Sequence, residues 1–134
     1  MSEVEDVEAI RRLTHEFSLA LDTMKLDALM DLFAPDAVFD TGMVEVPILN
    51  GLDEIRAFFS GTFDVLSYLF HLNGNHIIDV NGDTATGTVY HQASAVPVGG
   101  EIFTAYGYYA DSYARAAGGW KLQSRAATTL LDPG

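Results

Sequence analysis

The sequence predicts an α+β fold in which three N-terminal helices pack in a strongly curved, mainly antiparallel sheet. In the first half of the 134 residues, apolar side chains recur at the helical spacing of three and four. The second half is rich in Tyr, Val, Ile and Thr, with short glycine-containing turns between the stretches. Helices followed by strands favour helices on one face of a sheet, and no linker or repeat interrupts the chain. We therefore expect one domain over residues 1–134.

The apolar spacing predicts a first helix over Val4–Met24 and a second, short helix over Lys25–Phe33. Pro35 follows the second helix and is expected to end it, because proline cannot continue a helix. A first strand is expected at Ala37–Thr41, and a third helix at Leu52–Phe59 after a loop.

Four further strands are expected in the second half, and their separators suit antiparallel hairpins. These strands are Tyr68–Val80, Thr84–Val96, Glu101–Ala114 and Trp120–Thr129. The sheet should therefore be a meander that curves around the apolar stripe of the first helix.

Side chains alternate between the two faces of a strand, which assigns the faces of residues 84–96. The odd positions, including Val89, His91 and Ala95, are small or apolar apart from one histidine, whereas the even positions are polar. The odd face should turn inward, and its small residues leave space for a ligand pocket. His91 would face that space, as a second acid or as part of the pocket wall.

Composition excludes several classes of protein. The formal charge of −12 opposes binding to nucleic acid or to anionic membranes, so a neutral small molecule is the expected partner. The chain has no cysteine, which excludes disulfides, a thiolate nucleophile and Cys-ligated zinc. The acidic N-terminus does not resemble a signal peptide, and no apolar stretch reaches membrane-spanning length. We expect a cytoplasmic protein.

The order of elements, the segment LFAPDAVFDTG after the second helix and GGWKLQSR in the last strand resemble a known family. The chain is similar to the SnoaL-like branch of the nuclear transport factor 2-like superfamily, from about Val4 to Leu130. The resemblance implies a cone-shaped α+β fold. It does not imply one activity, because this fold hosts dehydratases, isomerases, cyclases, an epoxide hydrolase and binding domains.

The resemblance to the scytalone dehydratase and hexachlorocyclohexane dehydrochlorinase subgroups implies a catalytic pair, Asp22 and His71. Asp22 lies in LDTMKLDALMDLFAPDAVFD and His71 in FHLNGNHIIDVNGDTA. A buried carboxylate on one ring nitrogen would fix the tautomer of His71, and the other nitrogen could accept a proton. The alternatives are that Asp22 caps the second helix and that His71 is a hydrogen-bonded core residue.

Departures from scytalone dehydratase weaken the match to that specific chemistry. Leu21 and Thr41 occupy its tyrosine positions, and Ala95 occupies the position of a second histidine. Its asparagine position falls at Tyr109, which the resemblance places inside the cone, where the hydroxyl could donate to a substrate oxygen or simply pack. The expected substrate-contacting set is Leu21, Thr41, Phe58, Val89 and Ala95.

These observations predict an acid/base enzyme of the dehydratase, isomerase or cyclase type that needs no cofactor. The alternative is a non-catalytic domain of the same fold that binds a small ligand or associates. No HxH or HxxxH spacing indicates a metal site. Asp111 and Arg125 are expected to form an ion pair, and His15 is left outside the site as part of a solvated stripe. His76 is also left outside, because its strand parity is opposite to that of the inward residues unless a bulge at Gly74 resets the alternation. The resemblance implies a homodimer, with a trimer as the other option.

Overall fold

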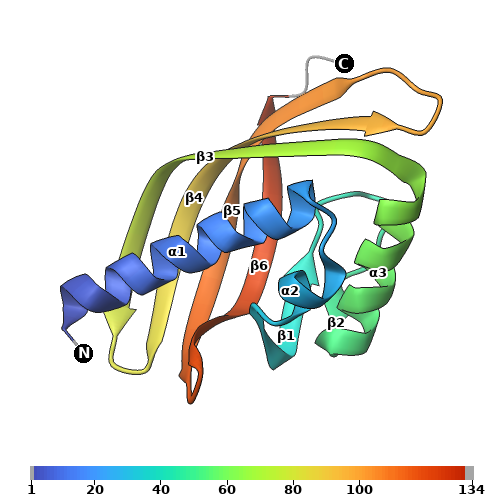
Figure 1. The fold of residues 1–134 in the computed structure, drawn as a ribbon. Helices are drawn as coiled ribbons and strands as arrows, with labels where there is room; N and C mark the ends of the chain where they lie inside the picture. Colours follow the sequence, from blue (N-terminus) through green and yellow to red (C-terminus); the bar gives the residue numbers. More distant parts are fainter. Residues whose placement is uncertain (1, 132–134) are drawn as a thin grey trace.

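The structure, a computed structural model, describes residues 2–131 and has the expected α+β architecture. A long helix lies across the concave face of a curved sheet, and two shorter helices lie at one end (Figure 1). The elements are α1 (Glu3–Asp22), α2 (Leu26–Met30), β1 (Phe33–Asp40), β2 (Leu49–Asn50), α3 (Gly51–Val65), β3 (Leu66–Asn81), β4 (Thr84–Pro97), β5 (Phe103–Ala116) and β6 (Gly119–Leu131).

The six strands form one sheet in the order β2-β1-β6-β5-β4-β3. Strands β3 to β6 pair with their sequence neighbours in antiparallel fashion, which confirms the meander. Strand β1 runs parallel to β6 and antiparallel to β2, so the sheet is mixed but mainly antiparallel.

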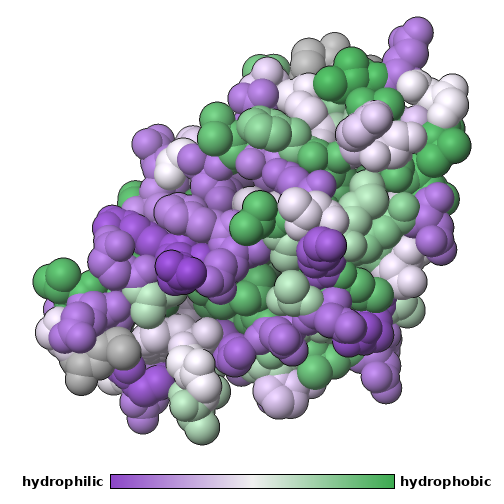
Figure 2. All heavy atoms as spheres, viewed as in Figure 1, coloured by the Kyte–Doolittle hydropathy of each residue, from purple (hydrophilic) through white to green (hydrophobic). Residues whose placement is uncertain are grey.

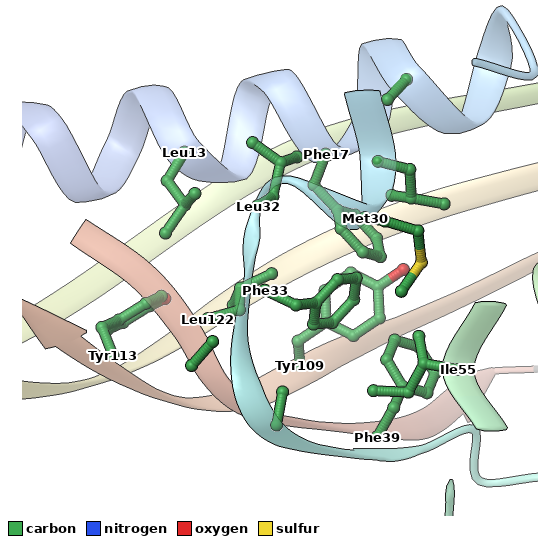
Figure 3. Close-up of a cluster of buried hydrophobic side chains, with 14 of the residues drawn as sticks. Leu13, Phe17, Met30, Leu32, Phe33, Phe39, Ile55, Tyr109, Tyr113 and Leu122 are labelled. Atoms are coloured by element: carbon green, nitrogen blue, oxygen red, sulfur yellow. The ribbon is translucent and has the colours of Figure 1, made fainter. Parts of the chain in front are cut away.

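Helix α1 is fixed to the sheet through both its apolar face and its N-terminal end. Ser2 and Glu5 form a capping box that satisfies the first free N–H groups of the helix. Asp6, on the first turn, accepts two hydrogen bonds from Arg115 at 2.8 and 3.0 Å and one from Trp120 at 3.0 Å. Farther along, Leu13 and Phe17 project into the core beneath the helix (Figure 3).

The predictions for the second helix and first strand were wrong at their boundary. Helix α2 ends at Met30, and Phe33 already pairs with Leu122 of β6 as the first residue of β1. Pro35 therefore lies inside a strand rather than after a helix. It occupies an irregularity in the β1–β6 register between Phe33 and Val38, where proline's missing N–H removes no ladder hydrogen bond.

The third helix is longer than predicted, ending at Val65 rather than Phe59, and the loop before it contains the short strand β2. Gly61 lies inside this helix although glycine weakens helices. Contact between the rings of Phe59 and Phe63, one turn apart at 6.4 Å, helps to hold the extra turns in place.

Strand β3 carries a bulge that changes which residues face inward. Asn73 pairs with His91, whereas the next pair is His76 with Val89, so β3 has one residue more than β4 in this interval. The extra residue resets the alternation. His71 and Asn73 therefore face the core before the bulge and His76 faces it afterwards, and β3 bends sharply over α1 (Figure 1).

Burial confirms that the odd residues of β4 face inward, because Ala85, Val89 and Ala95 are all buried. On the face shown in Figure 2, hydrophilic side chains cover α1, whereas apolar ones gather toward the end with α3, where β3 begins and β4 ends. Among residues 2–131, no helix is long and apolar enough to cross a membrane.

Candidate active site

The structure brings Asp22 and His71 into direct contact. The Asp22 carboxylate accepts a hydrogen bond from the backbone N–H of His71 at 2.9 Å, and its other oxygen lies 2.8 Å from Nδ1 of the imidazole. The side chain of Asp22 is 21% exposed and that of His71 is 10% exposed, so the pair is mostly shielded from solvent but still reachable. A carboxylate at this distance favours the tautomer with the proton on Nδ1, which leaves the Nε2 lone pair free.

The alternative that Asp22 caps the second helix is wrong. Asp22 is the last residue of α1, and the residue before α2 is Lys25, which makes no side-chain capping bond. A carboxylate at a helix C-terminus faces the negative end of the helix dipole. The two contacts with His71 compensate for this unfavourable position.

A second polar contact lies one helical turn before the dyad. Asn73 donates from its side-chain amide to the hydroxyl of Ser18 at 3.0 Å, joining β3 to α1. The Asn73 carbonyl oxygen is buried without a hydrogen bond to residues 2–131. The sequence analysis did not predict this pair. Its signal was the spacing: Ser18 lies four residues before Asp22 and therefore on the same face of α1, and Asn73 lies two residues after His71 and therefore on the same face of β3.

His91 and Tyr109 stack against each other inside the sheet. Their ring centroids are 4.1 Å apart with 23° between the planes. Burial lowers the pKa of His91 to about 4, and the neighbouring charges of His71 and Arg125 act in the same direction. Burial also raises the pKa of Tyr109 to about 12. Both side chains are therefore neutral at pH 7, so His91 does not supply an imidazolium acid in the free protein.

The expected ion pair of Asp111 and Arg125 is present and fully buried. Arg125 donates to both oxygens of Asp111 at 2.8 and 2.7 Å, and to the Thr14 hydroxyl at 3.3 Å. The guanidinium also lies 4.2 Å from the centre of the Tyr109 ring and 4.4 Å from that of Phe17. The Asp111 carboxylate balances the charge of the buried Arg125 guanidinium, and the guanidinium lies against the face of the Tyr109 ring.

Strand alternation without a bulge predicts that His76 faces outward, but the structure places it inside, half-buried. Its Nε2 lies 3.2 Å from the Tyr113 hydroxyl, which donates in turn to Asp111 at 2.6 Å. Burial lowers the pKa of His76 to about 4. Gly74 lies in the observed bulge, which is the condition under which the sequence allowed His76 to face inward.

The residues expected to contact a substrate occupy different environments. Leu21 and Val89 belong to the buried core, Ala95 is buried, and Phe58 packs partly buried against that core. Thr41 lies just after β1, where its hydroxyl accepts a hydrogen bond from the Met43 N–H in a local turn. The core beside them is aromatic: Phe17 contacts the rings of Phe33, Phe39, Phe59 and Tyr109.

Among residues 2–131, no three His, Asp or Glu side chains lie close enough together to hold a metal ion. Several polar groups of the interior form hydrogen-bonded pairs, and Nε2 of His71 beside them has no hydrogen bond to residues 2–131. Such an arrangement can accept and return a proton at His71 Nε2 and can donate neutral hydrogen bonds from Tyr109 and His91.

Comparison with known proteins gives the same fold. The family model of the SnoaL-like domain matches residues 2–126. The crystal structure of a candidate aromatic ring hydroxylase from Novosphingobium aromaticivorans superposes with a TM-score of 0.92 and 31% identity, covering 98% of this chain and 93% of that one.

Two more distant crystal structures represent the subgroups that the sequence resembles. A candidate scytalone dehydratase from Novosphingobium aromaticivorans has a TM-score of 0.88 and 23% identity, over 96% of this chain and 86% of that chain. The protein LinA has a TM-score of 0.86 and 19% identity, over 96% and 88% of the two chains; a related structure is named as a hexachlorocyclohexane dehydrochlorinase. The resemblance drawn from the sequence is thus confirmed: the chain belongs to the SnoaL-like family.

Proposed function

We propose that this protein is an acid/base enzyme, a lyase of the dehydratase type or an isomerase or cyclase, that acts without a cofactor. The observation that carries the proposal is the Asp22–His71 pair, in which one carboxylate holds both the backbone N–H and Nδ1 of the same histidine. Two hydrogen bonds to one carboxylate fix both the position and the tautomer of the ring. Solved structures with the same fold include one named as a candidate dehydratase and one named as a hexachlorocyclohexane dehydrochlorinase, which supports the choice of reaction class.

His71 is the proposed base and Asp22 the residue that orients it. Nε2 of His71 has no hydrogen bond to residues 2–131 and is not sealed from solvent, so it is available to a substrate proton. When Nε2 takes up that proton, the adjacent carboxylate stabilises the imidazolium that forms. The proton is expected to lie next to a carbonyl or a leaving group, and loss of water is the favoured outcome.

The proposed substrate is a neutral, largely apolar small molecule. The net charge of −12 and the carboxylate of Asp22 disfavour anions, whereas the aromatic core beside the dyad suits an apolar body. Leu21, Phe58 and Val89 are the proposed apolar contacts.

The test is turnover of a set of β-hydroxyketones, followed by the ultraviolet absorbance of the unsaturated product. Wild type should convert at least one of them, and His71→Ala should lose at least 10³-fold in kcat/KM. His15→Ala is the matched control, because His15 is exposed on α1. Equal rates for wild type and His71→Ala would refute the proposal and favour a ligand-binding role for the same fold.

We also propose that a second copy of the chain covers the outer face of the sheet, giving a homodimer. A hollow of about 350 Å³ lies on this face among Leu72, Tyr90, Tyr106 and Leu130, whose side chains are all exposed. One apolar surface continuous over several strands suits a symmetric, self-complementary contact. Sedimentation should give a dimer for wild type and a monomer for Leu72→Glu. A dimer of Leu72→Glu would refute this contact surface, and a trimer of wild type would refute the two-fold arrangement.

A further inference from the structure

We propose that Ser18 and Asn73 are positioning residues: their hydrogen bond holds the register of β3 and thereby keeps His71 facing the core. What this register serves rests on the proposed function, because an inward His71 is the proposed base. The apolar pattern of β3 conflicts with the register that the strand adopts, so specific contacts must hold it.

The apolar residues at the start of β3 face outward in the observed register. Before the bulge, His71 and Asn73 face the core, where they contact α1. Phe70 and Leu72, which alternate with them, lie on the outer face and are 52% and 57% exposed. The register of a strand normally buries its apolar set, so another interaction opposes that preference here.

A slipped register of β3 lies one residue away. If the extra residue of the bulge lay before Phe70, Phe70 would pair with Ala95, which is buried and faces the core. His71 would then pair with Ser94, which alternates with Ala95 and faces outward. Another irregularity in the pairing already lies between residues 66 and 68 of β3. Such a slip turns Phe70 inward and His71 outward in a single step.

Glycine does not fix the position of the bulge. Gly74 lies in the bulge but does not have the positive φ that would require a glycine. A Cβ at Gly74 would meet only the Tyr90 Cβ, at 3.8 Å, which is an ordinary contact. An alanine would therefore fit at Gly74. Since backbone geometry does not demand a bulge at this point, side-chain contacts must set its place.

Two polar contacts between α1 and β3 oppose the slip. Asp22 accepts a hydrogen bond from the backbone N–H of His71 at 2.9 Å and lies 2.8 Å from its Nδ1. One helical turn earlier, Ser18 accepts from the side-chain amide of Asn73 at 3.0 Å. The slipped register would carry His71 and Asn73 to the outer face and break both contacts.

The contact between Ser18 and Asn73 lies closer to the bulge than the dyad does. Asn73 is the last residue paired before the extra residue, and pairing resumes at His76. A slip that starts at the bulge must therefore release Asn73 before it reaches His71. On the other side of the bulge, His76 Nε2 lies 3.2 Å from the Tyr113 hydroxyl. The bulge is thus held between two polar contacts, and the one on the side of the dyad is Ser18 with Asn73.

The experiment measures the register of β3 by NMR, through nuclear Overhauser contacts between the backbones of paired residues. Wild type should show the pairing of His71 with Ala93. Ser18→Ala and Asn73→Ala should show a second register, in roughly 10% of the molecules or more, in which His71 pairs with Ser94. Wild-type pairing alone in both variants would overturn the inference.

A rescue variant separates this role from a general loss of stability. Because burial of Phe70 favours the slipped register, Phe70→Thr in the Ser18→Ala background removes that preference without restoring the hydrogen bond. Threonine keeps a high strand propensity. The double variant should therefore return to the wild-type register, and failure to do so would overturn the inference.

Asn75→Ala is the matched control, because Asn75 is exposed in the same bulge and should not affect the pairing. A slipped register in this variant would show that any change in the bulge moves it, which would also overturn the role of Ser18 and Asn73.

Turnover tests what the register does for the proposed base. In Ser18→Ala and Asn73→Ala, kcat/KM for the β-hydroxyketone should fall in proportion to the fraction of molecules that NMR finds in the wild-type register. Phe70→Thr should restore both quantities together. A register that slips in Ser18→Ala, with no turnover of any ketone by wild type, would refute the enzyme and retain the positioning role. Turnover that depends on His71, with an unchanged register in Ser18→Ala, would do the reverse.

Discussion

Asp22→Asn keeps the shape of the side chain but gives it one acceptor oxygen where the carboxylate has two. In the wild type, one oxygen accepts from the His71 backbone N–H at 2.9 Å and the other lies 2.8 Å from Nδ1. If the asparagine oxygen keeps the backbone contact, its NH₂ group faces Nδ1. That nitrogen must then become an acceptor, and the ring proton moves to Nε2. The opposite amide orientation sets the NH₂ group against the backbone N–H, which is also unfavourable.

The magnitude follows from these contacts. A hydrogen bond to a charged group contributes about 1.5–3 kcal/mol, so losing one and distorting the other should lower the free energy of unfolding by about 2 kcal/mol. The effect on activity should be larger, because a ring protonated on Nε2 presents no lone pair to the substrate. We expect a loss of about 10⁴-fold in kcat, as for the equivalent change in a serine protease triad.

Turnover of a β-hydroxyketone and urea unfolding of the same preparation check both figures, and nitrogen NMR of His71 reports the tautomer directly. Asp79→Asn is the matched control, since Asp79 is exposed on the same strand. Activity of Asp22→Asn within threefold of wild type, or a His71 proton that stays on Nδ1, would refute the tautomer reasoning.

Two further changes test the fold around the site. Because burial lowers the pKa of His76 and His91 to about 4, the unfolded chain binds more protons than the folded one between pH 6.5 and 4, and stability should fall as the pH falls through this window. Urea unfolding at pH 7 and pH 4.5 should differ by about 2–3 kcal/mol after allowance for solvent screening, and equal values would contradict the burial of both rings. Gly107→Ala should destabilise by about 2 kcal/mol or more, since a Cβ there would collide with the Thr128 carbonyl on β6, whereas Gly118→Ala, which meets open space, should be neutral in thermal unfolding.

The sequence predicts most of the fold because its two periodicities are strong. The spacing of three and four along α1 and the hairpin turns between β3 and β6 correspond closely to the observed elements. The prediction fails around Pro35, where local rules end a helix but pairing with β6 continues a strand. Tertiary hydrogen bonding overrides local preference there.

Prediction of the candidate site is limited for a different reason. Resemblance brings Asp22 and His71 together across 49 residues, and the structure shows that contact. Strand alternation gives the wrong face for His76, because one additional residue in β3 reverses every later position. The packing of Tyr109 between His91 and Arg125 could not be foreseen either. These contacts join side chains of three neighbouring strands, and no local sequence pattern encodes them.

The contacts at the two ends of α1 fix the length of that helix. Asp6 is held by Arg115 and Trp120 at one end, and Asp22 by His71 at the other. Asp22 lies 16 positions after Asp6, which corresponds to about 24 Å along the helix at 1.5 Å per residue. One inserted or deleted residue would rotate Asp22 by about 100° relative to Asp6, so both could not reach the sheet together. Family members that keep both carboxylate contacts should therefore have no insertion or deletion between these two positions of α1. An aspartate pair at this spacing can serve to recognise such members by sequence.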